Sequence, residues 1–300
     1  MPQIATPHGV TLEYETHGAP SDPPVLMISG YVMQLIGWPR DFAQLIADGG
    51  RYVITFDNRD NGLSEKFDGR PANFERVLGA AGNDDLAHAR ELAPYTLSDM
   101  ALDAVGLLSA LGIEQAHVVG ASLGGMIAQT IAIEHPERVL TLTSLMSTTG
   151  EPDYGQSTPE TLEALLTPTP DDREGYIEAS KNWLGWRSKR WPDAEFVRQL
   201  AADSYDRCHY PQGANRQLAA MVASGSRADG LRRLTTPTLV IHGLDDTLIA
   251  PSGGERTAEL VPGARLILVA DMGHDRPLPL WEQLTGAILE HTQPPLTGDR

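Results

Sequence analysis

Cysteine and basic residues are scarce in this sequence of 300 residues. The single cysteine, Cys208, excludes an internal disulfide and a CxxC metal site, which is typical of a protein in a reducing compartment. Only 23 lysines and arginines stand against 40 acidic residues, giving a formal net charge of −17. Because this charge repels phosphate backbones and anionic membrane surfaces, we expect no nucleic acid among the partners.

Long apolar runs are also lacking. No run approaches the roughly 20 residues that span a bilayer, so no membrane insertion is expected. The N-terminal segment, MPQIATPHGVTLEYETHG, lacks the basic stretch and apolar core of an export signal, which predicts a cytoplasmic protein. The sequence leaves the oligomeric state open between monomer and homodimer.

Cofactor motifs are missing as well. The chain contains neither HExxH nor a Walker pattern, and residues 120–125 depart from GxGxxG because Ser122 occupies the second glycine position. We therefore expect no cofactor and no metal.

What the chain does contain is a regular succession of short apolar runs and segments of helical period. The run at 10–16 alternates apolar and polar residues, as in a strand with one wet face, whereas the later runs are continuously apolar, as in strands covered on both faces. Residues 96–111 resemble a helix with a capping box formed by Thr96 and Asp99. The alternation predicts an α/β fold with a doubly wound, mostly parallel sheet. The expected strands are 10–16, 25–28, 52–56, 116–119, 139–146, 238–241 and 265–269.

Two segments interrupt this rhythm. Residues 66–94 are rich in glycine, alanine and aspartate and have weak periodicity, which predicts a mobile surface loop. Residues 151–233 form a long helical insertion after a central strand. We therefore expect a core of residues 1–150 and 234–300 and a helical cap of residues 151–233 over the strand ends.

Three tryptophans lie in the expected cap. Trp183, Trp186 and Trp191 predict an apolar, partly aromatic wall of a substrate pocket. The alternative is that these rings form the small core of the cap itself.

A serine lies where a buried strand turns directly into a helix, in AHVVGASLGGMIA. Gly120, Ser122 and Gly124 form a GxSxG pattern, which is short, so its context decides. Such a turn strains the corner residue, requires small neighbours and exposes the hydroxyl beside the N–H groups of the helix N-terminus. Ser122 is thus a candidate nucleophile, with Gly120 and Gly124 as the glycines of the elbow.

A serine nucleophile needs a base and a group that orients the base. Of the nine histidines, only His274 follows the last expected strand in a Gly-His loop, and it is the candidate base. The preceding strand ends before Asp245 and Asp246, which cannot both reach one imidazole. The order serine, aspartate, histidine is that of a hydrolase of the α/β type.

Loops after the first two parallel strands offer further candidates. The Gly30-Tyr31 turn lies where a second N–H group for an oxyanion is expected, so the backbone N–H groups of Tyr31 and Leu123 form the predicted oxyanion hole. In FDNRDNGLS, Asp57 could act as an acid, but we interpret Asp57 and Arg59 as an ion pair that holds a tight loop.

Four motifs together resemble the α/β-hydrolase superfamily, in particular the branch of aclacinomycin methylesterase and the mycobacterial LipG-type esterases. They are FDNRDNGLS at 56–64, HVVGASLGGMIAQ at 117–129, PTLVIHGLDD at 237–246 and MGHDRP at 272–277. The resemblance implies Ser122 as nucleophile, His274 as base and Asp246, rather than Asp245, as the acid. Many members have His-Gly at the oxyanion loop; this chain has Ser29-Gly30, so the histidine that braces the loop is absent.

The resulting hypothesis is a serine carboxylic-ester hydrolase that acts on small hydrophobic esters through an acyl-enzyme. Its partner would be a small-molecule ester. Thioesterase, lactonase or perhydrolase activity with the same triad is the alternative within this chemistry. A non-catalytic receptor that binds a small molecule beneath the cap is the alternative from another class.

Overall fold

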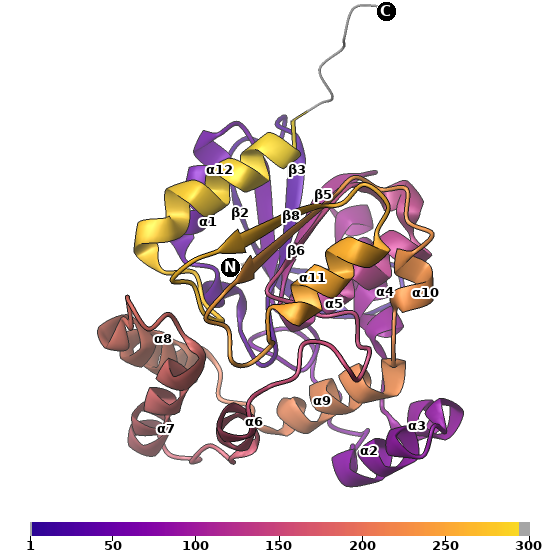
Figure 1. Ribbon diagram of the computed structural model, residues 1–300, viewed down its shortest axis with the longest axis vertical. Coiled ribbons are helices and arrows are strands. Elements are labelled where there is room, and N and C mark those ends of the chain that lie inside the picture. The colour runs from indigo at the N-terminus through magenta and orange to yellow at the C-terminus, as the bar shows by residue number, and fades with distance from the viewer. Residues whose placement is uncertain (1, 294–300) are drawn as a thin grey trace, which may run out of the picture.

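The computed structural model describes residues 2–293, and these contain one eight-stranded sheet (Figure 1). The strand order is β1-β2-β4-β3-β5-β6-β7-β8. β1 and β2 run antiparallel to their neighbours and the other strands are parallel, which confirms the predicted mostly parallel α/β sheet. The strands are β1 (Gln3–Ala5), β2 (Thr11–His17), β3 (Pro24–Ile28), β4 (Tyr52–Phe56), β5 (Ala116–Ala121), β6 (Val139–Leu145), β7 (Thr238–Gly243) and β8 (Arg265–Val269).

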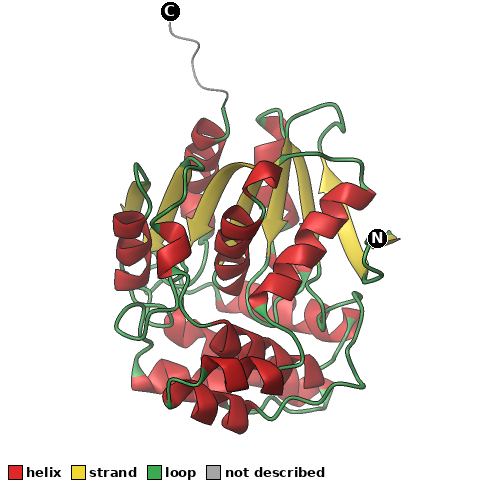
Figure 2. Ribbon diagram, turned by 90° about the vertical axis from the view of Figure 1, so that its right-hand side faces the viewer, coloured by secondary structure: helices red, strands yellow, loops and turns green. Residues whose placement is uncertain are grey.

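Helices cover both faces of this sheet (Figure 2). Along β5, Val118 faces a core built with α4 and α5, and its neighbour Val119 faces the opposite core, built with α1 and α12. Since successive side chains of a strand point to opposite faces, both faces of β5 are apolar. This is why the parallel strands are continuous apolar runs in the sequence.

The helices begin and end close to the predicted residues where the sequence signals were strong. Thr96 and Asp99 form the predicted capping box of α4, and its end at Ala110 precedes Gly112, whose φ is +72°. The helices are α1 (Arg40–Asp48), α2 (Phe74–Gly82), α3 (Leu86–Leu92), α4 (Leu97–Ala110), α5 (Leu123–Glu134), α6 (Pro159–Leu166), α7 (Arg173–Ala179), α8 (Ala194–Arg207), α9 (Gln212–Ser224), α10 (Ala228–Leu231), α11 (Ser252–Leu260) and α12 (Trp281–His291). Short 3-10 turns are η1 (Leu35–Gly37), η2 (Pro136–Arg138), η3 (Ser180–Trp186) and η4 (Leu278–Leu280).

The segment between β6 and β7 contains α6 to α10. In Figure 1, α6, α7, α8 and α9 lie together below the sheet, at one end of the molecule. The short α10 instead packs on α5 and α11 beside the sheet. We call α6 to α9, with η3, the insertion helices.

The prediction of a mobile loop at residues 66–94 is wrong. This segment contains α2 and α3, which pack on the insertion helix α9. Val77, Ala80 and Ala89 form a small core with two alanines of α9. Small side chains make most of this contact, and α2 and α3 have only nine and seven residues, so neither shows the longer helical period of α4.

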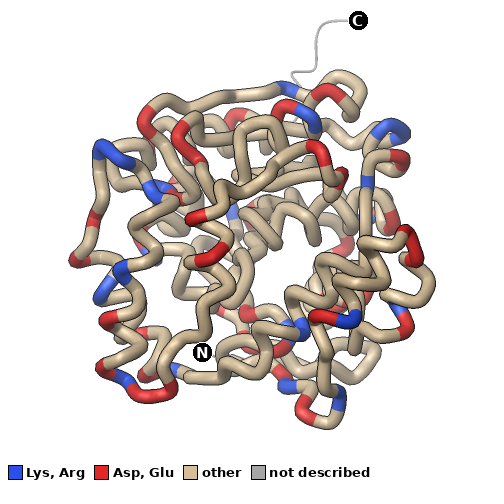
Figure 3. Tube along the Cα trace, turned by 60° about the horizontal axis from the view of Figure 1, so that its bottom comes forward, with Lys and Arg blue, Asp and Glu red and all other residues tan. Residues whose placement is uncertain are grey.

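Charged residues are distributed around the periphery of the molecule (Figure 3). Among residues 2–293, no helix is both long enough and apolar enough to cross a bilayer.

Candidate active site

Ser122 lies at the turn between β5 and α5, the best-defined feature of the site. Its φ of +57° and ψ of −123° fall in a region that non-glycine residues rarely adopt. Strain of this kind costs about 1–3 kcal/mol and persists only where the surroundings enforce it. Here the backbone N–H of Ser122 donates to the carbonyl of Leu145 at 2.9 Å, and the Ser147 hydroxyl donates to the carbonyl of Ser122 at 2.8 Å.

Close backbone approaches explain the glycines on either side of Ser122. A Cβ on Gly120 would lie 2.0 Å from the carbonyl oxygen of Gly124, and a Cβ on Gly124 would lie 2.1 Å from the carbonyl oxygen of Ile28. Real Cβ atoms do not approach backbone this closely. The two glycines therefore let α5 start directly against the ends of β5 and β3.

The loops after β7 and β8 come together at the same edge of the sheet as Ser122. β5, β7 and β8 are parallel, so the residues that follow them share the carboxyl edge, where ligands bind in open α/β sheets. The N–H of Asp245 donates to the carbonyl of Met272 at 2.9 Å. A Cβ on Gly243 would lie 2.2 Å from that same carbonyl oxygen, so the two loops are tightly packed.

Asp246 and His274 are hydrogen-bonded across these loops. Nδ1 of His274 lies 2.7 Å from Oδ2 of Asp246, whose side chain is fully buried. Oδ1 of Asp246 accepts the N–H groups of Leu248 and Ile249, both at 2.9 Å. With Nδ1 donating to the carboxylate, the Nε2 atom of a neutral His274 ring is left as an acceptor.

The surroundings keep Asp246 ionised. Burial by itself raises the pKa of this carboxyl, but the charge of His274 and hydrogen bonds from His242 and His274 outweigh burial and lower the pKa to about 2. Nε2 of His242 lies 3.3 Å from Oδ2 of Asp246. Asp245, by contrast, is half-buried, and its backbone rather than its side chain joins the two loops.

The insertion helices hold the loop that carries His274. The N–H of His274 donates to the carbonyl of Trp186, at the end of η3. A Cβ on Gly273 would lie 2.5 Å from the carbonyl carbon of Arg187, so glycine permits this approach. Asp275 accepts the N–H of Ser188 at 3.0 Å and fixes the same contact from the other side.

The loop between β3 and α1 lies directly beside Ser122. A Cβ on Gly30 would lie 3.2 Å from Cβ of Ser122, so the Gly30-Tyr31 turn adjoins the elbow. The N–H of Met33 donates to the carbonyl of Gly30, which closes a turn that has Val32 at a φ of +48°. Burial raises the pKa of the Tyr31 hydroxyl, so this side chain stays neutral.

Other polar groups take the place of the absent histidine in bracing this loop. Nδ2 of Asn58 donates to the carbonyl of Ser29 at 3.1 Å, and the Ser29 hydroxyl lies 3.4 Å from the carbonyl of Gln34. The N–H of Val32 donates to Oε1 of Gln217 on α9 at 2.9 Å. Asn58 lies in the motif FDNRDNGLS but was not predicted to brace this loop, and Gln217, on the insertion, lies in no motif.

The predicted pairing of Asp57 with Arg59 is wrong. Asp57 is fully buried, ion-pairs with Arg207 of α8 at 2.7 Å and accepts the N–H of Leu35. Arg59 instead pairs with Asp103 on α4. Asp57 and Asp103 each form an ion pair that holds a loop, and in both pairs the arginine lies far away in the sequence.

The three tryptophans of the insertion are half-buried, and each makes a different contact. Trp183 packs edge to face on Tyr176, Trp191 lies under the guanidinium of Arg190, and Trp186 contributes its carbonyl to His274. Their role in a substrate pocket stays a prediction.

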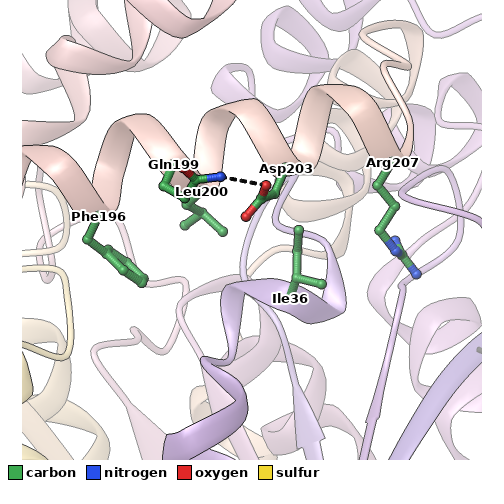
Figure 4. A pocket seen from close by; sticks show the side chains of 6 residues that line it. All are labelled: Ile36, Phe196, Gln199, Leu200, Asp203 and Arg207. Atoms are coloured by element: carbon green, nitrogen blue, oxygen red, sulfur yellow. Dashed lines mark hydrogen bonds between the residues drawn. The ribbon is translucent and has the colours of Figure 1, made fainter.

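A cavity of about 310 Å³ lies between η1 and α8 (Figure 4). Its walls are mostly apolar, and Ile36 of η1 projects toward α8, which supplies the other lining residues. The lining residues are Ile36, Phe196, Gln199, Leu200, Asp203 and Arg207. This cavity shares the loop of Tyr31 but contains none of the three tryptophans.

Within residues 2–293, no three side chains of the metal-binding types come together as a metal site would require. The acyl-transfer chemistry that this arrangement can support needs only a nucleophile, a base, an orienting acid and N–H donors.

Known proteins of similar sequence include two methylesterases. Rhodomycin D methylesterase DauP of Streptomyces sp. (strain C5) is 30% identical, over 97% of this chain and 98% of that protein. Rhodomycin D methylesterase DnrP of Streptomyces peucetius is 29% identical over the same shares of the two chains. Among solved structures, the enol-lactonase from Burkholderia xenovorans LB400 superposes with a TM-score of 0.72 at 20% identity, over 97% of this chain and 99% of that one.

A family model described as the alpha/beta hydrolase fold matches residues 23–276, which include Ser122, Asp246 and His274. That span runs from the start of β3 to the loop after β8. The chain belongs to the alpha/beta hydrolase fold family.

Proposed function

We propose that this protein is a serine carboxylic-ester hydrolase with Ser122, His274 and Asp246 as its catalytic triad. The observation that carries the proposal is the 2.7 Å hydrogen bond between His274 and the buried Asp246, at the same sheet edge as the strained Ser122. The similarity to two methylesterases supports an ester as the substrate.

The reaction follows from these groups. Nε2 of His274 takes the proton of the Ser122 hydroxyl as Oγ attacks the ester carbonyl, and the N–H groups of Tyr31 and Leu123 hold the oxyanion. His274 then protonates the leaving alcohol as the bond from the carbonyl carbon to the alcohol oxygen breaks. A water molecule, deprotonated by His274, attacks the acyl-enzyme, and the acid leaves as Oγ regains its proton.

The substrates we propose are small hydrophobic carboxylic esters, methyl esters included. The tryptophans of the insertion, Trp183, Trp186 and Trp191, favour an uncharged acyl group. We further propose that residues 151–233 are a cap over a core of residues 1–150 and 234–300. The contact of Trp186 with the loop of His274 supports this division.

The test is hydrolysis of p-nitrophenyl esters from acetate to palmitate by the wild-type protein and by Ser122→Ala. We expect turnover that falls by several orders of magnitude without Ser122, and a preferred acyl length that reports the depth of the pocket. Undiminished turnover by Ser122→Ala would refute the mechanism. No turnover of any ester by the wild type would favour a receptor that binds without catalysis.

A further inference from the structure

Gln217 of the insertion helix α9 is fully buried and bonds to two loops of the core. Its Oε1 accepts the N–H of Val32 at 2.9 Å, and its Nε2 donates to the carbonyl of Arg59 at 3.0 Å. A buried amide whose donor and acceptor are both used has one preferred orientation. Gln217 thus joins the loop after β3 to the loop after β4.

The bond to Val32 matters because of the backbone that it holds. Val32 is a β-branched residue at a φ of +48°, in the third position of the turn closed between Gly30 and Met33. Turns with a positive φ at this position favour glycine, so valine adopts the conformation only under constraint. By accepting the Val32 N–H, Gln217 fixes the peptide between Tyr31 and Val32, next to the N–H group that we propose as an oxyanion donor.

The helix that carries Gln217 is itself firmly placed. Arg216 forms two hydrogen bonds of 2.8 Å with the carboxylate of Asp60, and both side chains are buried. A Cβ on Gly213 would lie 2.1 Å from the carbonyl oxygen of Asp60, so α9 begins against this loop. The position of Oε1 is therefore set by the docking of α9 on the core.

We infer that Gln217 is a positioning residue for ester hydrolysis: from the insertion, it holds the turn at Tyr31 in the conformation that aims the Tyr31 N–H at the oxyanion. This inference rests on the proposed function. It makes the insertion part of the catalytic machinery, because the oxyanion hole forms only when α9 is seated.

The test compares Gln217→Met with Gln129→Met. Gln129 is also fully buried and bonds through both ends of its amide, to Ser144 and Arg227, neither of which belongs to the turn. Each variant is assayed for its thermal midpoint, for kcat and KM on p-nitrophenyl butyrate, and for inhibition by phenylboronic acid. That probe forms a tetrahedral adduct with an active-site serine.

We expect both variants to lose thermal stability, and only Gln217→Met to lose kcat. Its kcat should fall about 10- to 100-fold, the scale of a misplaced catalytic group, with KM changed less than about threefold. The inhibition constant of phenylboronic acid should rise by the same factor as kcat/KM falls. Gln217→Glu keeps an oxygen for the Val32 N–H but replaces the donor to the Arg59 carbonyl with a second oxygen, so it should recover only part of the lost kcat. Gln217→Asn, whose amide is one methylene group shorter, carries the same test should the methionine variant not fold.

A folded Gln217→Met or Gln217→Asn variant with wild-type kcat would overturn the inference. So would an equal loss of kcat in Gln129→Met, or a loss of kcat without weaker binding of phenylboronic acid. In each of these cases the wild type is still active and dependent on Ser122, so the proposed function stands. If the wild type has no Ser122-dependent turnover, the proposed function fails, and the inference fails with it.

Discussion

Asp245 and Asp246 are adjacent and chemically identical, and their exchange for asparagine separates the two roles. In the triad that we propose, Asp246→Asn removes the carboxylate that orients His274, and the ring is then free to present an N–H rather than a lone pair to Ser122. A change of this kind lowers kcat by up to about 10⁴-fold in serine hydrolysis. Asp245→Asn should keep kcat within about twofold. The Asp245 side chain is half-buried and does not orient His274 in the proposed triad, so its exchange should have little effect on turnover.

The stability of the fold should depend on pH through Asp246. The pKa of Asp246 is about 2, whereas an ordinary aspartate has a pKa of about 3.9, a difference that corresponds to about 2–3 kcal/mol. As the pH falls through about 3.9, the unfolded chain binds a proton that the folded chain does not bind until about pH 2. The contribution is therefore complete above about pH 5 and is lost as the pH falls toward 2.

Urea unfolding of the wild type, Asp246→Asn and Asp245→Asn between pH 3 and pH 7 measures this contribution. The wild type should exceed Asp246→Asn by about 2–3 kcal/mol at pH 7, and the difference should shrink toward pH 3. Asp245→Asn should differ little from the wild type at any pH. A loss of kcat in Asp245→Asn as large as that in Asp246→Asn, or a stability difference that does not change with pH, would refute the reasoning.

Two further substitutions test the architecture of the site. Gly124→Ala should destabilise the protein by several kcal/mol or abolish folding, because its Cβ would lie 2.1 Å from a carbonyl oxygen of β3. The matched control is Gly79→Ala in α2, where a Cβ meets nothing within 4 Å. This substitution should raise the thermal midpoint. A soluble Gly124→Ala variant with an unchanged thermal midpoint would contradict the close approach. Asp57→Asn should lower the free energy of unfolding by about 3–5 kcal/mol, because it leaves Arg207 without its nearest carboxylate. Urea unfolding measures this loss, and a value below about 1 kcal/mol would show that Asp57 does not brace these loops.

The sequence predicted the core of the fold well, because parallel strands covered on both faces require continuous apolar runs. β5 at 116–121 and α4 with its capping box at Thr96 and Asp99 are clear examples. β1, of only three residues, is too short to show a period. α2 and α3 were not predicted because they are short, with nine and seven residues, and pack on α9 mainly through alanines.

The residues of the candidate site likewise differ in how far the sequence predicts them. Ser122 and His274 follow strand ends and lie in motifs, so the sequence predicts them as candidates, whereas the choice of Asp246 over Asp245 rests on the resemblance to the α/β-hydrolase superfamily. Gln217 bonds to Val32 across 185 residues, and Arg207 reaches Asp57 across 150. Such pairs depend on how the insertion docks on the core, which no local pattern encodes.

The most direct test of the central claim is covalent labelling of the wild-type protein with a fluorophosphonate, followed by mass spectrometry of its peptides. The account predicts one adduct per chain, on the peptide that contains Ser122, and a loss of esterase activity in proportion to labelling. An ester-hydrolysing protein that stays unlabelled at Ser122, or that is inactivated by an adduct elsewhere, would contradict the account.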